Sequence, residues 1–326
     1  MQIYDFNVSS LFRNVITAMP HLHHPTRFSS KLLVAASLLV SSTVAIAPAQ
    51  ANSLKNATIG GTAATDYLLY DSNNTHTFLN PTANLQTILS GTAANPTGNV
   101  ELAASSEKAG FDFTKNTTLN GTIGGRAISI SSLTASDWSS NYKDTTFGQH
   151  WFNSALTANG FRNMVGTSTS TTLFNVFKNN GGFQRFSDPN ISYVSQDATN
   201  VINMGLAGHY DASPLFTKSI DQYVATTKLS ASQKVMMAGL KSQLSSKIIQ
   251  ASEVVKTTYE GKTDYGFSFS ATKSGLVEKS DNLSHTGNYV ISRQGIEPME
   301  KKVPEPSIVL GLMALGGLAK RKLRRR

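Results

Sequence analysis

Two uncharged apolar segments, one near each end of the chain, limit which part of the sequence can fold in water. The first covers residues 32–47 and the second covers residues 307–319. Each segment is apolar enough to enter a lipid bilayer, whereas the sequence between them is polar. The intervening stretch, residues 52–303, has about 250 residues, which is enough for one large domain or two small ones with a hydrophobic core.

The first apolar segment has the form of an export signal. Lys31 precedes it, and Ala49, Gln50 and Ala51 follow it with the small-x-small pattern that signal peptidase cuts. The sequence therefore predicts a leader over residues 1–51 and signal peptidase as a processing partner. Cleavage is expected between Ala51 and Asn52, so that Asn52 becomes the first residue of the mature protein.

The second apolar segment lies between two further signals. Pro304, Glu305 and Pro306 precede it, and six of the last seven residues are Lys or Arg. Proline fixes φ and lacks an amide hydrogen, so this tripeptide is expected to be extended and accessible to an enzyme. The basic end is expected to stay in the cytoplasm. As a helix, the apolar segment would reach only about 20 Å, against a hydrocarbon core of about 30 Å.

This order of a Pro-Glu-Pro motif, an apolar segment and a basic end resembles the PEP-CTERM sorting signal of exported bacterial proteins, over residues 304–326. The resemblance implies that an intramembrane exosortase recognises and cuts the tail, whose short membrane helix anchors the protein until then. It also implies a destination in the cell envelope or the extracellular matrix, because exosortase systems are associated with exopolysaccharide and biofilm. Exosortase, the membrane and exopolysaccharide are therefore the expected partners.

The formal charge of +9 is carried mostly by the two ends of the chain. Six basic residues lie in the last seven positions and three more lie in the leader, so the body is close to neutral. Such a body lacks the basic surface that binds nucleic acid, and no nucleic-acid partner is expected. The chain has no cysteine, which excludes disulfides, thiol nucleophiles and cysteine-ligated zinc. No cofactor-binding motif is present, and no cofactor is expected.

Hydrophobic periodicity divides the body into three parts. Residues 52–143 read as short strands separated by turn residues, residues 144–250 mainly have the period of amphipathic helices, and residues 251–293 return to strands. This order predicts an α+β fold in which the N- and C-terminal parts form a sheet or sandwich around a helical insert. Two apolar targeting helices would flank a mature body over residues 52–297, with a linker at residues 298–303.

Local signals indicate where several elements begin. Thr146 and Gln149 have the spacing of a capping box, as do Ser230 and Gln233. Further helices are expected at residues 171–180 and from Ser213, and strands at residues 191–194, 201–206, 254–259 and 289–291. Alternation is clearest at residues 265–271, and this pattern predicts a single strand with an aromatic face.

Three residues are the best candidates for contact with a ligand. Trp138 lies near other aromatic residues, and exposed aromatic rings stack on sugars, although Trp138 suits the hydrophobic core equally well. His209 and Asp211 would supply a base with a carboxylate, or metal ligands, if their segment is extended. Asp211 also suits a cap before Pro214. No Gly-x-Ser-x-Gly, His-Glu-x-x-His or Walker motif occurs, so no catalytic or metal-binding residue is assigned.

The body is also similar to a cyanobacterial family of PEP-CTERM proteins whose function is unassigned. The resemblance lies in residues 98–102, 126–128, 182–190 and 205–211. It implies an exported protein that an exosortase handles, and it transfers no catalytic residue.

These signals favour an exported, exosortase-processed protein of the cell surface or extracellular matrix, without catalytic activity. The first alternative is a secreted carbohydrate-binding or carbohydrate-active protein. The second is an envelope-anchored hydrolase that uses Asp188, His209 or Asp211.

Overall fold

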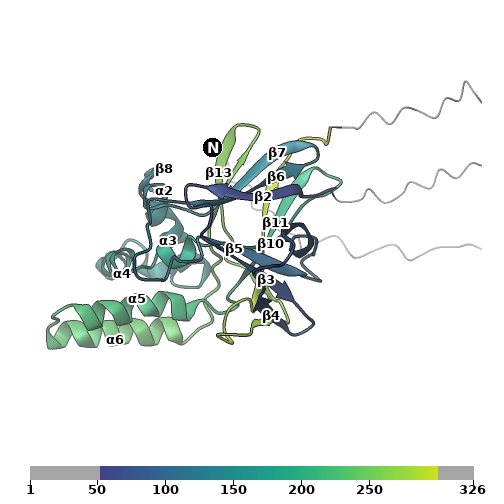
Figure 1. Cartoon of the computed structure of the whole chain (residues 1–326). Helices are drawn as coiled ribbons and strands as arrows, with labels where there is room; N and C mark the ends of the chain where they lie inside the picture. Colours follow the sequence, from purple (N-terminus) through teal and green to yellow (C-terminus); the bar gives the residue numbers. More distant parts are fainter. Residues whose placement is uncertain (1–51, 300–326) are drawn as a thin grey trace, which may run out of the picture. The chain divides into compact units, whose positions relative to one another are not determined.

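Strands from both ends of the body and from its middle form two main sheets in the computed structural model, which describes residues 52–299 (Figure 1). The large sheet has nine strands in the order β14-β16-β11-β10-β5-β3-β4-β15, with β1 beside β10. The small sheet has five strands in the order β13-β12-β7-β6-β2. The fold is thus a large curled sheet combined with helices, which confirms the expected mixture of strands and helices. The two apolar targeting helices lie outside the described residues.

The longest strands of the large sheet, β16, β11 and β10, are neighbours in it. Its strands are β1 (Asn52–Ser53), β3 (Tyr67–Ser72), β4 (His76–Leu79), β5 (Gly98–Leu102), β10 (Asn190–Gln196), β11 (Val201–Gly208), β14 (Ala271–Lys273), β15 (Val277–Glu278) and β16 (Gly287–Gln294). Those of the small sheet are β2 (Lys55–Gly61), β6 (Thr117–Ile123), β7 (Arg126–Ser131), β12 (Val255–Tyr259) and β13 (Lys262–Gly266). The short strands β8 (Asn141–Tyr142) and β9 (Thr145–Thr146) pair with each other.

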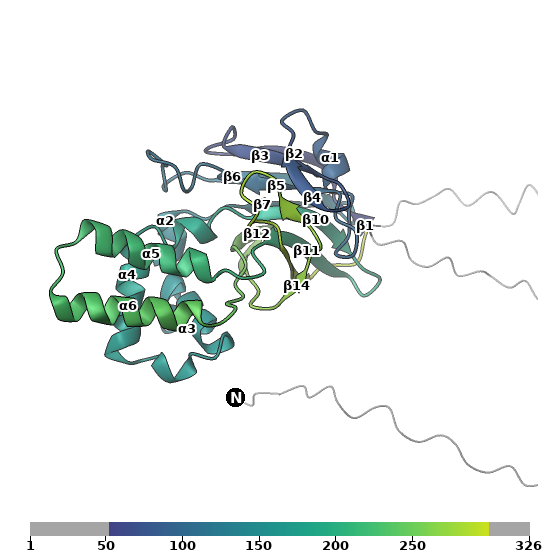
Figure 2. The ribbon, with the colours of Figure 1, turned by 90° about the horizontal axis from the view of Figure 1, so that it is seen from below.

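Five helices gather on one side of the strands in both views of the ribbon (Figures 1 and 2), whereas the short helix α1 (Leu85–Ile88) lies against β2, β3 and β5. The five are α2 (Ala135–Ser139), α3 (Phe147–Ala158), α4 (Ser168–Asn179), α5 (Ser213–Thr226) and α6 (Ala231–Ser245). Of these, α3 to α6 carry the amphipathic pattern seen in the sequence. Their buried side chains include Trp151 of α3, Phe177 of α4, Phe216 of α5 and Leu240 of α6, which belong to one hydrophobic core.

The helix starts follow from side-chain caps. The Thr146 side chain accepts a hydrogen bond from the Gln149 amide, but the Gln149 side chain bonds Asn153 instead of returning to Thr146. Thr146 is therefore a simple N-cap rather than one half of a capping box. At α6, Ser230 and Gln233 do form the reciprocal capping box that the sequence predicts.

A second core lies between the two sheets and is mainly aliphatic, with Tyr259 and Tyr289 as its buried aromatic residues. The small sheet contributes Ile128 and Ile130, which are both buried in β7. The large sheet contributes Val100 and Met204 to the same cluster. Because the two sheets bury side chains in one common core, they stabilise each other by apolar burial, without disulfides.

Two strands from the mainly helical part, β10 and β11, lie at the centre of the large sheet. They confirm the strands expected near residues 191–194 and 201–206. β10 pairs with β5 from the N-terminal part, and β11 pairs with β16 from the C-terminal part. These long-range pairings place Glu101 directly opposite Asn190.

The alternating segment at residues 265–271 is not a single strand, contrary to the sequence prediction. Its ends belong to β13 and β14, which lie in different sheets. Between these two strands, the Ser268 amide donates a 2.9 Å hydrogen bond to Ser252 Oγ. The Ser252 amide donates a bond of the same length to the Ser268 carbonyl. Phe267 and Phe269 pack against the helical core. The alternation therefore arises because the chain passes from one sheet to the other along an aromatic core.

The end of the described chain remains attached to the body. Gln196 donates through Nε2 to the Ile296 carbonyl at 2.7 Å, and the Met299 amide donates to the Gly124 carbonyl at 2.9 Å. Gly124 and Gly125 both have positive φ, and the turn that they make passes close to Pro298 and Met299. Contacts with the body thus extend through the first two residues of the segment expected to be a linker.

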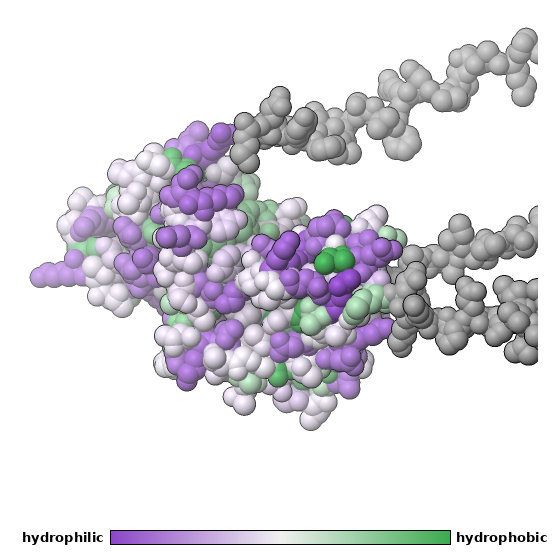
Figure 3. Space-filling model, turned by 90° about the horizontal axis from the view of Figure 1, so that it is seen from above, coloured by the Kyte–Doolittle hydropathy of each residue, from purple (hydrophilic) through white to green (hydrophobic). Residues whose placement is uncertain are grey.

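Hydrophilic and weakly polar residues cover most of the face shown in Figure 3, and apolar residues form only small separate areas there. Within residues 52–299, no helix is both long enough and apolar enough to cross a membrane.

Candidate functional site

A polar cavity of about 420 Å³ opens among β5, β10, β11, α5 and the segment between β15 and β16. We call it the acidic cavity, because six carboxyl residues line it: Glu101, Glu107, Asp188, Glu253, Glu278 and Asp281. His209 and His285 also line it, as do Lys108, Arg185 and Lys218. Several of these groups are buried, and clusters of titratable groups with perturbed pKa values are typical of functional sites.

Glu101 and Asp188 are brought together by the pairing of β5 with β10. Glu101 lies opposite Asn190 in the register of the two strands, and Asp188 precedes Asn190 by two residues. The Leu102 amide donates a 3.1 Å hydrogen bond to the Pro189 carbonyl, which ties the two segments together beside the carboxyls. Both side chains therefore reach the cavity from adjacent, hydrogen-bonded segments of backbone.

The Glu101 carboxyl is held by Tyr70. The Tyr70 hydroxyl donates to Glu101 Oε2 at 3.0 Å. Burial, together with the nearby charge of Asp188, raises the pKa of Glu101 to about 8. Burial also raises the pKa of Tyr70, so the phenol keeps its proton and stays a donor. Glu101 is thus a protonated acid at neutral pH.

Asp188 and Glu253 each have one buried carboxyl oxygen without a hydrogen-bond partner in the described part of the chain. Asp188 accepts a hydrogen bond from Ser106 at Oδ2, while Asp188 Oδ1 is unpaired. Glu253 is only 6% exposed, and its Oε2 is unpaired. Burial raises the pKa of Asp188 to about 7 and that of Glu253 well above its ordinary value. Buried polar atoms normally have partners, so these two oxygens mark a place for one.

His285 forms a neutral, fixed wall of the acidic cavity. It is 3% exposed, and its Nδ1 lies 2.7 Å from Thr77 Oγ1 while its Nε2 lies 3.2 Å from Asn190 Oδ1. Tyr70 meets the imidazole edge to face, with ring centroids 4.9 Å apart. Burial lowers the pKa of His285 to about 3, so the imidazole is uncharged at neutral pH.

The structure separates the two residues that the sequence paired as candidates. His209 lines the acidic cavity, where burial lowers its pKa and its Nε2 lies 3.4 Å from Ser284 Oγ. Asp211 instead binds two backbone amides: its Oδ1 accepts hydrogen bonds from the amides of Ser213 at 2.9 Å and Ile249 at 3.1 Å. Asp211 thus holds the start of α5 against the segment after α6, although the N-cap position of α5 is Ala212 and not Asp211.

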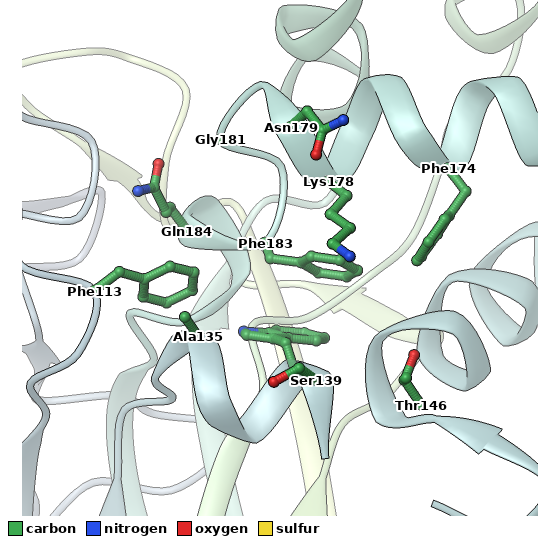
Figure 4. A pocket seen from close by; sticks show the side chains of 11 residues that line it. Phe113, Ala135, Ser139, Thr146, Phe174, Lys178, Asn179, Gly181, Phe183 and Gln184 are labelled. Carbon is green, nitrogen blue, oxygen red and sulfur yellow. The ribbon is translucent and has the colours of Figure 1, made fainter. Parts of the chain in front are cut away.

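Trp138 lies at the edge of a second, aromatic pocket of about 290 Å³. Figure 4 shows Phe113, Phe174 and Phe183 around this pocket, with the ammonium group of Lys178 extending over it. Trp138 itself is only 4% exposed, stacks on Phe183 with centroids 4.4 Å apart, and donates through Nε1 to Ser187 Oγ at 2.7 Å. It therefore presents little of its ring to a ligand.

Sequence reasoning named Asp188 and His209 in the cavity but missed Glu101, Glu253 and His285. Glu101 and Asp188 do lie in two of the stretches that carry the resemblance to a family, residues 98–102 and 182–190. Glu253 and His285 lie in no motif. Within residues 52–299, no group of three or more His, Asp or Glu side chains is arranged to hold a metal ion.

Comparison with known proteins concerns the tail. Residues 302–326 match the model of the PEP-CTERM protein-sorting motif, a match that includes the Pro-Glu-Pro tripeptide. The chain carries a PEP-CTERM sorting signal. The signal marks it as an exported protein that exosortase processes and that is anchored transiently in the membrane by its C-terminus. No curated protein and no solved structure matches the chain significantly.

Proposed function

We propose that the chain is an exported protein of the cell surface or extracellular matrix, processed by exosortase, whose mature body binds a saccharide in the acidic cavity. The PEP-CTERM signal supports the export route, and the association of exosortase systems with exopolysaccharide supports the ligand class. The observation that carries the proposal is the pair of buried, unpaired carboxyl oxygens, Asp188 Oδ1 and Glu253 Oε2, within the described residues.

Sugar hydroxyl groups match the lining of the acidic cavity. Its walls offer carboxyl, imidazole, hydroxyl and amide groups, which together donate and accept hydrogen bonds, as sugar hydroxyls do. An unpaired buried polar atom costs about 1–3 kcal/mol, so a ligand hydroxyl that donates to one of the free oxygens recovers that loss. The volume of about 420 Å³ falls within the range of small-molecule sites, roughly 300–1,000 Å³.

The cavity favours one of the alternative functions that the sequence left open. The lack of a catalytic motif favoured a surface protein without activity, but buried carboxyls around a cavity favour the carbohydrate-binding or carbohydrate-active alternative. The acidic cavity is a better saccharide site than the pocket at Trp138, because that indole is covered by Phe183 and exposes only 4% of its surface.

Binding tests this proposal directly. The processed protein is titrated by calorimetry with a panel of neutral and uronic-acid tetrasaccharides. We expect at least one member to bind, and Glu253→Gln, which alters an unpaired acceptor inside the cavity, to weaken that binding about tenfold, corresponding to one charged or polar contact of about 1.4 kcal/mol. The matched control, Glu260→Gln, lies on the β12–β13 turn and should bind like the unaltered protein. Failure of every tetrasaccharide to bind would overturn the proposal.

Processing of the tail gives a separate prediction. Replacing Pro304, Glu305 and Pro306 together by alanine removes the extended segment that exosortase is expected to recognise. The variant should therefore accumulate in the membrane with its tail intact, whereas the unaltered protein should be recovered from the cell surface beginning at Asn52 and lacking residues 307–326. Intact-mass spectrometry of both forms measures this difference. Pro298→Ala, outside the motif, is the control and should be processed normally.

A further inference from the structure

We infer that the acidic cavity hydrolyses a glycosidic bond, with Glu101 as the proton donor and Asp188 as the group that activates water. The inference rests on the proposed binding of a saccharide in this cavity. The two carboxyls line the same cavity and come from adjacent backbone segments. Glycoside hydrolysis commonly uses such a pair, in which one carboxyl is protonated and the other is ionised.

Glu101 has the surroundings of a general acid. The Tyr70 hydroxyl fixes one carboxyl oxygen at 3.0 Å, which orients the group that carries the proton. Burial and the neighbouring Asp188 raise the Glu101 pKa to about 8, so the acid form is available at neutral pH. A proton donor is most effective when its pKa lies near the working pH, because the acid is then both populated and strong enough to give up its proton.

Asp188 has the surroundings of the partner base. Ser106 donates to Asp188 Oδ2, whereas Asp188 Oδ1 is buried and has no hydrogen-bond partner among residues 52–299. Burial raises the Asp188 pKa to about 7, so the carboxylate form that activates water is populated at and above neutral pH.

The reaction consumes one water molecule. The Glu101 proton moves to the glycosidic oxygen as the bond between that oxygen and the anomeric carbon breaks, and the bond's electron pair stays on the departing oxygen. The water oxygen forms a new bond to the anomeric carbon, and one water proton passes to the Asp188 carboxylate. Glu101 ends as a carboxylate and Asp188 as an acid, and proton exchange with solvent restores both.

The experiment measures release of reducing ends by the processed protein from the tetrasaccharide that it binds. Glu101→Gln and Asp188→Asn are each expected to lower kcat by about 10²- to 10⁴-fold, the usual contribution of one acid or base. Binding affinity should change by less than about fivefold, because Glu101 and Asp188 act on the scissile bond and on water, whereas Glu253 is the acceptor for a sugar hydroxyl. Asp221→Asn, on the exposed side of α5 where Asp221 pairs with Lys241, is the matched control and should keep full activity.

The outcomes separate this inference from the proposed function. If no tetrasaccharide binds, the proposed function fails. If one binds and the unaltered protein releases no reducing ends from it between pH 5 and 9, the hydrolysis inference alone fails, and this result does not depend on whether any variant folds. Unchanged kcat in correctly folded Glu101→Gln would likewise reject Glu101 as the proton donor. Thermal unfolding of each variant shows whether it is folded.

Discussion

Replacement of Trp151 by alanine is expected to lower the free energy of unfolding by about 3–5 kcal/mol, the usual loss for a large aromatic side chain removed from a core. Trp151 is fully buried in α3. Its ring lies 4.7 Å from that of Phe186 and 6.1 Å from those of Phe216 and Phe269, measured between centroids. The substitution leaves a cavity where α4, α5 and the segment between the two sheets meet, and these elements cannot all collapse into it.

Trp151→Phe is the matched control for this prediction. The indole Nε1 is buried without a hydrogen-bond partner in the described residues, and such an unpaired donor costs about 1–3 kcal/mol. Phenylalanine keeps a ring in the core and removes that donor, so we expect Trp151→Phe to lose less than half of what Trp151→Ala loses. Guanidinium unfolding followed by circular dichroism measures both. A loss below about 1 kcal/mol for Trp151→Ala would contradict the packing of this core.

The four longer helices, α3 to α6, could be predicted from the sequence because their signals are local, whereas α1 and α2 lie in the part that was expected to form strands. α3 and α6 each begin at a side-chain cap that is followed by a buried stripe, which starts at Phe147 in α3 and at Met237 in α6, and both signals can be read without knowing the fold. The alternation at residues 265–271 gave a wrong prediction, because the cover of its aromatic side chains depends on the whole fold. Period-two burial shows only that alternate side chains are covered, and here Phe267 and Phe269 are covered by the helical core rather than across a sheet.

The acidic cavity could not be predicted, because it depends on pairings between distant segments. Glu101 and Asp188 are 87 positions apart in the sequence, and only the register of β5 with β10 brings them together. Glu253 and His285 reach the same cavity from the start of β12 and from the turn before β16. Spacing did single out His209 and Asp211, but in the structure Asp211 binds backbone amides away from the cavity.

The folded protein is expected to lose stability as the pH rises through the range of its raised carboxyl pKa values, and to lose it again in acid, where His285 takes up a proton only in the unfolded chain. Above the ordinary values of 4.5 and 3.8, Glu101 and Asp188 would be ionised in the unfolded chain, whereas the folded chain keeps their protons up to pKa values of about 8 and 7. Folding then binds protons, so stability falls as the pH rises through this range. His285 acts in the opposite direction: its pKa falls from 6.5 to about 3, so its own contribution to stability falls as the pH drops below 6.5.

Above pH 6.5 His285 is mostly uncharged in both the folded and the unfolded chain. The change of stability with pH in this range therefore comes from the carboxyls. Each unit of pKa shift corresponds to about 1.4 kcal/mol, so the loss expected between pH 6.5 and 9 is a few kcal/mol. Glu101→Gln keeps the size of the side chain and its contact with Tyr70 but cannot ionise. The variant should therefore lose clearly less stability over this range than the unaltered protein, in guanidinium unfolding at each pH.

His285→Asn is the complementary control, because it removes a group that titrates only below pH 6.5. It should flatten the acidic side of the stability profile and leave the alkaline side unchanged. If the profiles of Glu101→Gln and the unaltered protein run parallel between pH 6.5 and 9, Glu101 titrates as a solvated carboxyl. In that case it is already ionised at neutral pH, and it cannot be the proton donor of the acidic cavity, whatever ligand the cavity binds.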